Sequence, residues 1–234
     1  MLKNLLFNWP VSAAIVAVAA LTCPAVQAAP VFTDSFEVDI SACSSISLHY
    51  CDFVPSQTIG PWAVTAGSVD VLEQAAANPA YSVVAQNGVK SLDLYGFNAG
   101  TISTTFATVA SQVYQVTFFY SREPDRNGVG SNSPVPSSLS VVAAGGSAQT
   151  FSFSGTSTPA NMLWTQGLYN FTATGTSTTL SFAALNGVNG GGAMLDNVSV
   201  SAVPEPAEWA MLLSGIGLVG WAAKRRRGAP SKPA

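Results

Sequence analysis

Charged side chains are scarce in this chain of 234 residues, of which 9% are Asp, Glu, Lys or Arg and 48% are hydrophobic. So few charges exclude a solvated, disordered chain. Basic residues are especially rare in the middle, because the stretch from Ala29 to Val203 holds ten acidic and three basic residues, a net charge of −7 (3 minus 10). That balance excludes a nucleic-acid-binding surface, which needs basic residues to neutralise phosphates.

Recognisable catalytic motifs are also missing. There is no Gly-x-Ser-x-Gly elbow, His-Glu-x-x-His sequence or phosphate-binding loop. His49 is the only histidine and has no nucleophile motif to serve, so we expect it to be a surface residue. Glu123 and Asp125 lie on either side of a proline and are themselves flanked by Arg122 and Arg126, which predicts a solvated loop. We therefore expect no enzyme; a glycoside hydrolase whose carboxylates meet only in space is the remaining catalytic alternative.

The N-terminal residues 1–28 have the pattern of a secretory signal peptide. Lys3 supplies a positive start, the run from Val11 to Leu21 is nearly all apolar, and Ala28 follows small residues suited to cleavage. An uncleaved membrane anchor is the alternative. The sequence thus predicts an exported protein.

The C-terminal end has three consecutive parts: a proline-rich motif, an apolar run over residues 209–223 and a basic cluster. As a helix the run would be about 23 Å long, shorter than a hydrocarbon core of about 30 Å. Flanking basic side chains can extend to the interface, and their charge favours the cytoplasmic side. We expect one hydrophobic membrane helix. The motif is Pro204, Glu205 and Pro206, and the cluster is Lys224, Arg225, Arg226 and Arg227.

This tail, over residues 203–227, resembles the PEP-CTERM sorting signal of Gram-negative bacteria. The resemblance implies a partner, the membrane enzyme exosortase, which would process the chain near the motif. It also implies a membrane-anchored precursor and a final place in the cell envelope or extracellular matrix. Residues 228–234 form a short extra tail that departs from the pattern. An unprocessed membrane anchor is the alternative.

Residues 29–202 predict one all-β domain. Short apolar or alternating segments rich in Val, Thr and Phe recur between Gly, Asn, Ser and Pro. Roughly ten strands at this spacing are typical of a β-sandwich or jelly roll. The predicted strands are 32–36, 62–65, 69–72, 91–94, 100–106, 113–120, 138–143, 148–154, 163–173, 178–185 and 193–200.

The order of these segments resembles extracellular modules called choice-of-anchor C or DUF642-like domains. The matching pieces run from Asp34-Ser35-Phe36-Glu37 to Leu195-Asp196-Asn197-Val198. The resemblance implies a galactose-binding-like jelly roll. It also implies that Glu37 and Asp196 lie close together and could hold a structural Ca²⁺, with Asp34 as a further ligand. Carboxylates bonded to backbone amides are the alternative. The family pattern lacks the stretch 39–60, which we therefore expect to be an inserted loop.

Two cysteines, Cys43 and Cys51, remain after the signal peptide. An even number in an exported protein favours a disulfide. A metal site formed with His49 is the alternative.

The expected function is that of a non-enzymatic envelope or matrix protein. The first alternative is a module that binds exopolysaccharide, with exposed aromatic rings stacking on sugars. An ice-binding protein with threonine-rich strands is a further alternative. The candidate aromatic residues are Tyr95, Phe97, Tyr120, Trp164 and Tyr169.

Overall fold

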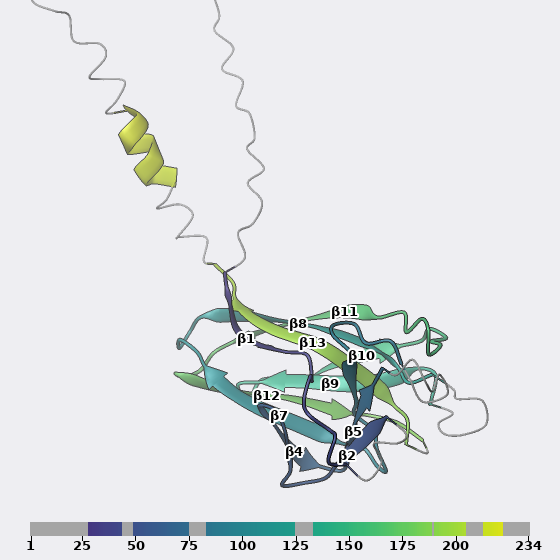
Figure 1. The fold of residues 1–234 in the computed structure, drawn as a ribbon. Helices are drawn as coiled ribbons and strands as arrows, with labels where there is room; N and C mark the ends of the chain where they lie inside the picture. The colour runs from purple at the N-terminus through teal and green to yellow at the C-terminus, as the bar shows by residue number, and fades with distance from the viewer. Residues whose placement is uncertain are drawn as a thin grey trace, which may run out of the picture.

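The computed structural model describes residues 28–43, 49–74, 83–124, 133–188, 190–204 and 213–221. Residues 28–204 of this set form a sandwich of two antiparallel sheets (Figure 1). The predicted all-β sandwich is confirmed. The predicted signal peptide lies outside the described residues, apart from Ala28, and so does most of the sorting motif and its basic cluster.

Sheet A has the strand order β11-β8-β13-β6-β5-β2, and β1 also pairs with β13. Its strands are β1 (Pro30–Asp34), β2 (Tyr50–Phe53), β5 (Val69–Glu73), β6 (Lys90–Asp93), β8 (Val113–Arg122), β11 (Thr165–Thr172) and β13 (Ala193–Ala202). Sheet B has the order β10-β9-β12-β7-β4-β3. Its strands are β3 (Thr58–Ile59), β4 (Trp62–Ala66), β7 (Thr101–Ala107), β9 (Ser137–Ala143), β10 (Gln149–Phe153) and β12 (Ser177–Ala184).

The stretch 39–60 is not simply a loop, and that prediction was wrong. It contains β2, which pairs with β5, and β3, which pairs with β4. Both lie at sheet edges and are short, with four and two residues. Such short segments carry too little alternation for a strand prediction, because neighbouring strands rather than local pattern stabilise them.

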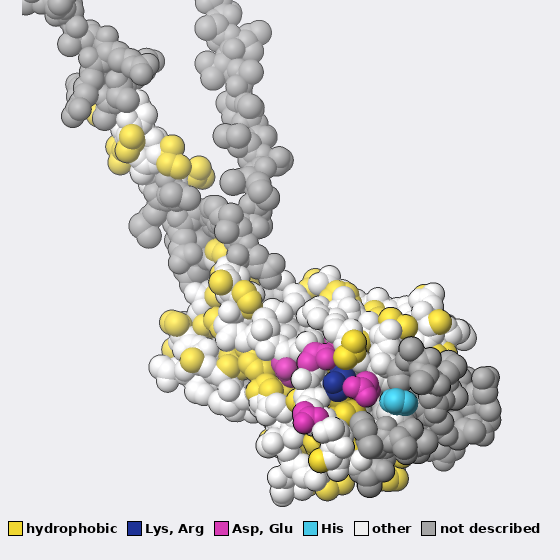
Figure 2. All heavy atoms as spheres, in the orientation of Figure 1, with side chains coloured by type: hydrophobic (Ala, Val, Ile, Leu, Met, Phe, Trp, Pro, Cys, Tyr) yellow, Lys and Arg dark blue, Asp and Glu magenta, His cyan; other side chains and the backbone are white. Residues whose placement is uncertain are grey.

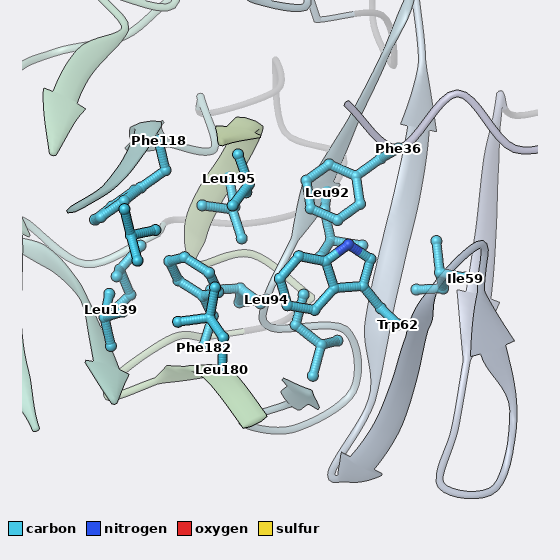
Figure 3. Close-up of a cluster of buried hydrophobic side chains, with 14 of the residues drawn as sticks. Phe36, Ile59, Trp62, Leu92, Leu94, Phe118, Leu139, Leu180, Phe182 and Leu195 are labelled. Carbon is cyan, nitrogen blue, oxygen red and sulfur yellow. The ribbon is translucent and has the colours of Figure 1, made fainter. Parts of the chain in front are cut away.

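Aromatic and aliphatic side chains together fill the space between the sheets (Figure 3). Trp62 is fully buried, and its ring contacts Phe32, Phe36 and Phe182, with centroids 5.5, 6.0 and 5.8 Å away. Its indole N–H donates to the Asp34 carboxylate at 2.7 Å. Since Phe32 and Asp34 belong to β1, these contacts attach the N-terminal strand to the core.

The two ends of the sandwich domain lie together. Strand β1 pairs antiparallel with β13, with Pro30 opposite Ser201 and Asp34 opposite Val198. Both chain ends therefore leave the sandwich at one end, as Figure 1 shows. We call this the stem end and the opposite one the distal end.

The hydrophobic tail is helical over residues 213–221, within the run predicted as a membrane helix. None of the helices among the described residues combines the length and apolar character needed to cross a bilayer. The rest of the predicted run lies outside the described residues.

Candidate functional site

Two carboxylates, one from just after the first strand and one from the last strand, hold the backbone of one loop, residues 86–90. Asp196 Oδ2 accepts hydrogen bonds from the backbone N–H groups of Gln86 and Asn87 at 2.7 and 3.1 Å. Glu37 Oε1 accepts from Val89 and Lys90 at 2.8 and 2.7 Å. Glu37 and Asp196 therefore bind the same loop, whereas their predicted role as calcium ligands stays a prediction. We call this arrangement the carboxylate clamp.

Gly88, at the centre of the clamped loop, has a backbone conformation that favours glycine, with φ +73°. A Cβ at this position would collide with the Glu37 carboxylate. The clamp therefore depends on a glycine between the two pairs of N–H groups.

Asp196 reaches the loop because β13 is irregular at that point. The register between β13 and β8 shifts between Asp196 and Ser199, and Asn197 has φ +48°. The Asn197 N–H donates to Asp196 Oδ1 at 2.6 Å. A bulge of this kind redirects a side chain and often occurs beside functional positions.

Burial raises the pKa of Asp196 to about 7, because the fully buried side chain has lost the water that stabilises its charge. The three backbone N–H groups oppose this rise, and the nearby negative charge of Glu37 adds to it. Burial also raises the pKa of Asp34, although the bond from Trp62 opposes that effect. The clamp thus contains a carboxyl group that changes its charge near neutral pH.

The predicted calcium ion can be compared with the oxygen atoms that would bind it. Calcium takes six to eight oxygen ligands. Both Asp196 oxygens and Glu37 Oε1 already accept backbone N–H groups, and Asp34 Oδ2 accepts the Trp62 indole. Within the described residues, no group of three or more His, Cys, Asp or Glu side chains is placed to hold a metal. These carboxylate oxygens already accept hydrogen bonds from N–H groups, an arrangement that suits amides better than a cation, so calcium stays a prediction.

A small ionic cluster lies beside the clamp. Lys90 Nζ is 3.3 Å from Glu73 Oε1, and His49 Nδ1 is 3.7 Å from Glu73 Oε2. Figure 2 shows this mixture of acidic, basic and histidine side chains on one face. His49 is partly exposed, at 26% for its side chain.

The predicted disulfide between Cys43 and Cys51 is present, with Cα atoms 5.7 Å apart. It joins the segment after β1 to β2. The bond uses both thiols, so the alternative metal site with His49 is excluded.

A second group of polar side chains lies on the face of sheet A away from the main core. Asp70 and Asp93 are directly opposite each other on β5 and β6. Their neighbours Val71 and Leu92 point into the main core, so the two acids point the other way. Both have polar or electrostatic partners. Alternation along the strands could have predicted which face of the sheet each acid occupies. That the two acids lie opposite each other could be seen only from the register of β5 and β6.

The predicted solvated loop around Glu123 is partly wrong. Arg122 and Glu123 are 3% and 2% exposed. Arg122 Nε donates to the Ser133 carbonyl, and the Glu123 backbone N–H donates to Gly192. Glu123 therefore continues the β8 ladder instead of entering solvent. Asp125 and Arg126 lie outside the described residues.

An open groove of about 750 Å³ lies between the edge strands of the two sheets. The β9–β10 turn forms one wall and the end of β11 the other. The Tyr169 hydroxyl accepts the Ala143 N–H at 3.2 Å, which holds the two walls together. Every lining residue is uncharged; the polar side chains among them are Ser147, Gln149, Thr150, Tyr169, Asn170, Thr172 and Thr174.

Of the five aromatic residues predicted to stack on sugars, Phe97 is largely exposed, at 74%. Tyr169 is buried, at 5%. Trp164 is half-buried and donates its indole N–H to Val84 at 2.9 Å. Tyr95 and Tyr120 pack against the core. Together these rings do not form one exposed platform.

The family model for a protein of unknown function, DUF642, matches residues 34–201. The chain belongs to the DUF642 family. A model of the PEP-CTERM protein-sorting motif matches residues 202–227, which supports an exported protein sorted by an exosortase. No curated protein matches the chain.

Several solved structures are similar to this DUF642 chain. One is TmCBM61 in complex with β-1,4-galactotriose, at 18% identity and a TM-score of 0.39, covering 60% of this chain and 87% of that one. Another is the CBM22-1 xylan-binding domain of Paenibacillus barcinonensis Xyn10C, at 14% identity and 0.41, covering 76% and 97%. A third is a family 35 carbohydrate-binding module from Clostridium thermocellum, at 12% identity and 0.37, covering 64% and 90%.

Proposed function

We propose that this chain is a non-enzymatic protein of the cell envelope or extracellular matrix, whose tail an exosortase processes. One observation carries the proposal: β13 ends at Ala202, and the match to the sorting motif begins at residue 202. The last strand of the domain therefore continues directly into the processing signal.

The fold supports this role because both chain ends leave at the stem end. In the precursor, residues 209–223 would hold the stem end at the membrane and leave the distal end facing outward. After cleavage, the sandwich would be released with its hydrogen bonds intact, because the sorting signal follows the last strand.

The test is to replace Pro204, Glu205 and Pro206 together with alanine in the native cell. We expect the variant to keep its full C-terminus and stay in the membrane fraction. The wild-type protein should leave the membrane fraction and have a lower mass, because its C-terminal segment has been removed. Intact-mass measurement of both fractions reads the result. Glu208→Ala, just after the motif, is the control and should be processed normally. A motif variant released at the wild-type mass would contradict the proposal.

We also propose, as a second function, that the released domain binds a neutral exopolysaccharide in the groove between β10 and β11. Hydroxyl and amide side chains line this groove, and none of the lining residues is charged. Such groups exchange hydrogen bonds with sugar hydroxyls without paying for the burial of a charge.

Binding to exopolysaccharide purified from the host tests this second function. Gln149→Trp should fill the groove and reduce the bound fraction. Gln166→Trp is the matched control, because Gln166 is also an exposed edge-strand residue but does not line the groove. Equal binding by both variants would place any glycan elsewhere.

A further inference from the structure

Four exposed valines surround the point where the two chain ends leave the sandwich. Val31 in β1 is 45% exposed, Val113 at the start of β8 is 39% exposed, and Val203 after β13 is 37% exposed. Val109, in the turn between β7 and β8, is 66% exposed. We call these four residues the stem collar.

The four valines of the stem collar lie on adjoining elements. Val203 N–H donates to the Val113 carbonyl at 2.9 Å, so the segment just after β13 lies beside the start of β8. Gln112 Nε2 donates to the Val203 carbonyl at 2.7 Å, which attaches the turn that contains Val109. Val31 lies beside the other edge of β13, because β1 pairs there.

Charged side chains are absent from the described residues around this collar. The turns 108–112, 144–148 and 173–176 and the segments 28–33 and 198–204 contain none. The charged residue nearest to the collar along β1 is Asp34, opposite Val198. Figure 2 shows hydrophobic side chains where the chain ends leave and the charged ones farther along the sandwich.

The length of the tail fixes what this end can touch. Trp209, at the start of the apolar run, follows Pro204 by five residues. A fully extended chain of that length spans about 18 Å at most. While the apolar run is in the membrane, the collar is therefore held close to the bilayer surface. A tether this short gives the collar a high effective concentration at the bilayer surface, so even a weak contact with lipid would be populated.

We propose that the stem collar is a lipid-facing surface that rests on the bilayer in the tail-anchored precursor. The proposal builds on the proposed function, because it needs the tail in the membrane. The valines can enter the apolar boundary of the headgroup region, while backbone hydrogen bonds already satisfy the turn. Within the described part of the sandwich, the acidic residues lie away from the collar, which limits repulsion from anionic headgroups.

The structure offers a matched pair of positions for the test. Val109 and Val54 each begin a turn in which the N–H of a glutamine three residues later donates to the valine carbonyl at 3.1 Å. Val109 is at the stem end. Val54 follows β2 and is 43% exposed; it is at the distal end, because Phe53 pairs with Val69 at the far end of sheet A. A fluorescent label on Val109→Cys or Val54→Cys therefore samples similar turns at opposite ends.

The experiment uses the exported chain with its tail, reconstituted in vesicles of phosphatidylethanolamine and phosphatidylglycerol. Cys43 and Cys51 are paired and take no label. We expect an environment-sensitive dye at position 109 to shift its emission to shorter wavelength and to be quenched by spin-labelled lipid. The dye at position 54 should behave as it does without lipid.

The outcomes separate the two proposals. If the protein does not float with the vesicles, the tail does not anchor it and the proposed membrane stage fails. If it floats but the dyes at 109 and 54 are equally exposed to water, the anchor stands and the collar proposal is wrong. If the dye at 109 is shielded in native membranes but not in vesicles, the collar binds a protein and the lipid assignment is wrong.

Discussion

The two sheets share one core but present different surfaces. All charged residues found in the described strands belong to sheet A: Asp34, Asp52, Asp70, Glu73, Lys90, Asp93, Arg122 and Asp196. The strands of sheet B contain only uncharged residues. Sheet B instead pairs hydroxyl groups across its strands, with Ser103 and Ser181 2.8 Å apart and Thr105 and Thr179 3.1 Å apart.

The difference shows how this chain folds with few charges. On sheet A, carboxylates bind backbone amides of a loop, so long-range contacts depend on charged groups. On sheet B, Ser and Thr hydroxyl groups form hydrogen bonds with hydroxyl groups of the neighbouring strand. We therefore expect pH and redox state to affect the stability of sheet A in different degrees, and sheet B to respond to neither of them directly.

The largest expected effect is on pH dependence through Asp196. The pKa of Asp196 is raised to about 7 in the folded state, against 3.8 for the free group. Between these values the folded state binds more protons, so the free energy of unfolding must fall as pH rises from about 4 to 7, by up to roughly 4 kcal/mol. Asp34, whose pKa is also raised, acts in the same direction. Denaturant unfolding at several pH values measures the slope.

Asp196→Asn should flatten this slope, because the amide does not titrate. Asp52→Asn, on β2 of the same sheet, is the control and should leave the slope near the wild-type value. If Asp196→Asn keeps the full pH dependence, another group controls it.

The second effect is on the disulfide of sheet A. Reducing Cys43–Cys51 should lower the free energy of unfolding by about 2–3 kcal/mol, because the bond restricts the unfolded chain. Hydrogen exchange should rise more in β2 than in β12, since the bond attaches β2 at the edge of sheet A. A uniform rise in both strands would mean that the bond stabilises the whole domain and has no local effect.

A smaller effect is expected for the hydroxyl ladder of sheet B. In a double-mutant cycle, Ser103→Ala and Ser181→Ala should show a coupling energy of about 0.5–1 kcal/mol, because each hydroxyl bonds to the other. The coupling should not change between pH 4 and 7, as neither group titrates. Strictly additive single mutants would show that the pair contributes nothing.

The smallest effect is expected from calcium removal. Because backbone amides already bind the clamp oxygens, we expect the melting temperature of the exported protein to be unchanged by chelator. A melting temperature that falls with chelator and rises with free calcium would instead support the ion implied by the family resemblance. Asp196→Ala should then abolish the calcium response.

The sequence predicted most of the fold for a simple physical reason. Strands with one buried face alternate visibly, as in β8, where Tyr114, Val116 and Phe118 point into the core. Strands β2 and β3 escaped prediction because they are short and are stabilised by β5 and β4. The disulfide could be predicted because Cys43 and Cys51 are the two cysteines outside the predicted signal peptide.

The sequence by itself determined the all-β class, the cysteine pair and the sorting motif, because each depends on local pattern or on residue counts. Only the tertiary structure decided how charges and contacts meet. Glu37 and Asp196 are far apart along the chain, and it is the β1–β13 pairing and the bulge in β13 that direct them to one loop. The stem collar likewise exists because three strands and a turn end together, since neighbouring strand ends are set by register and not by sequence separation.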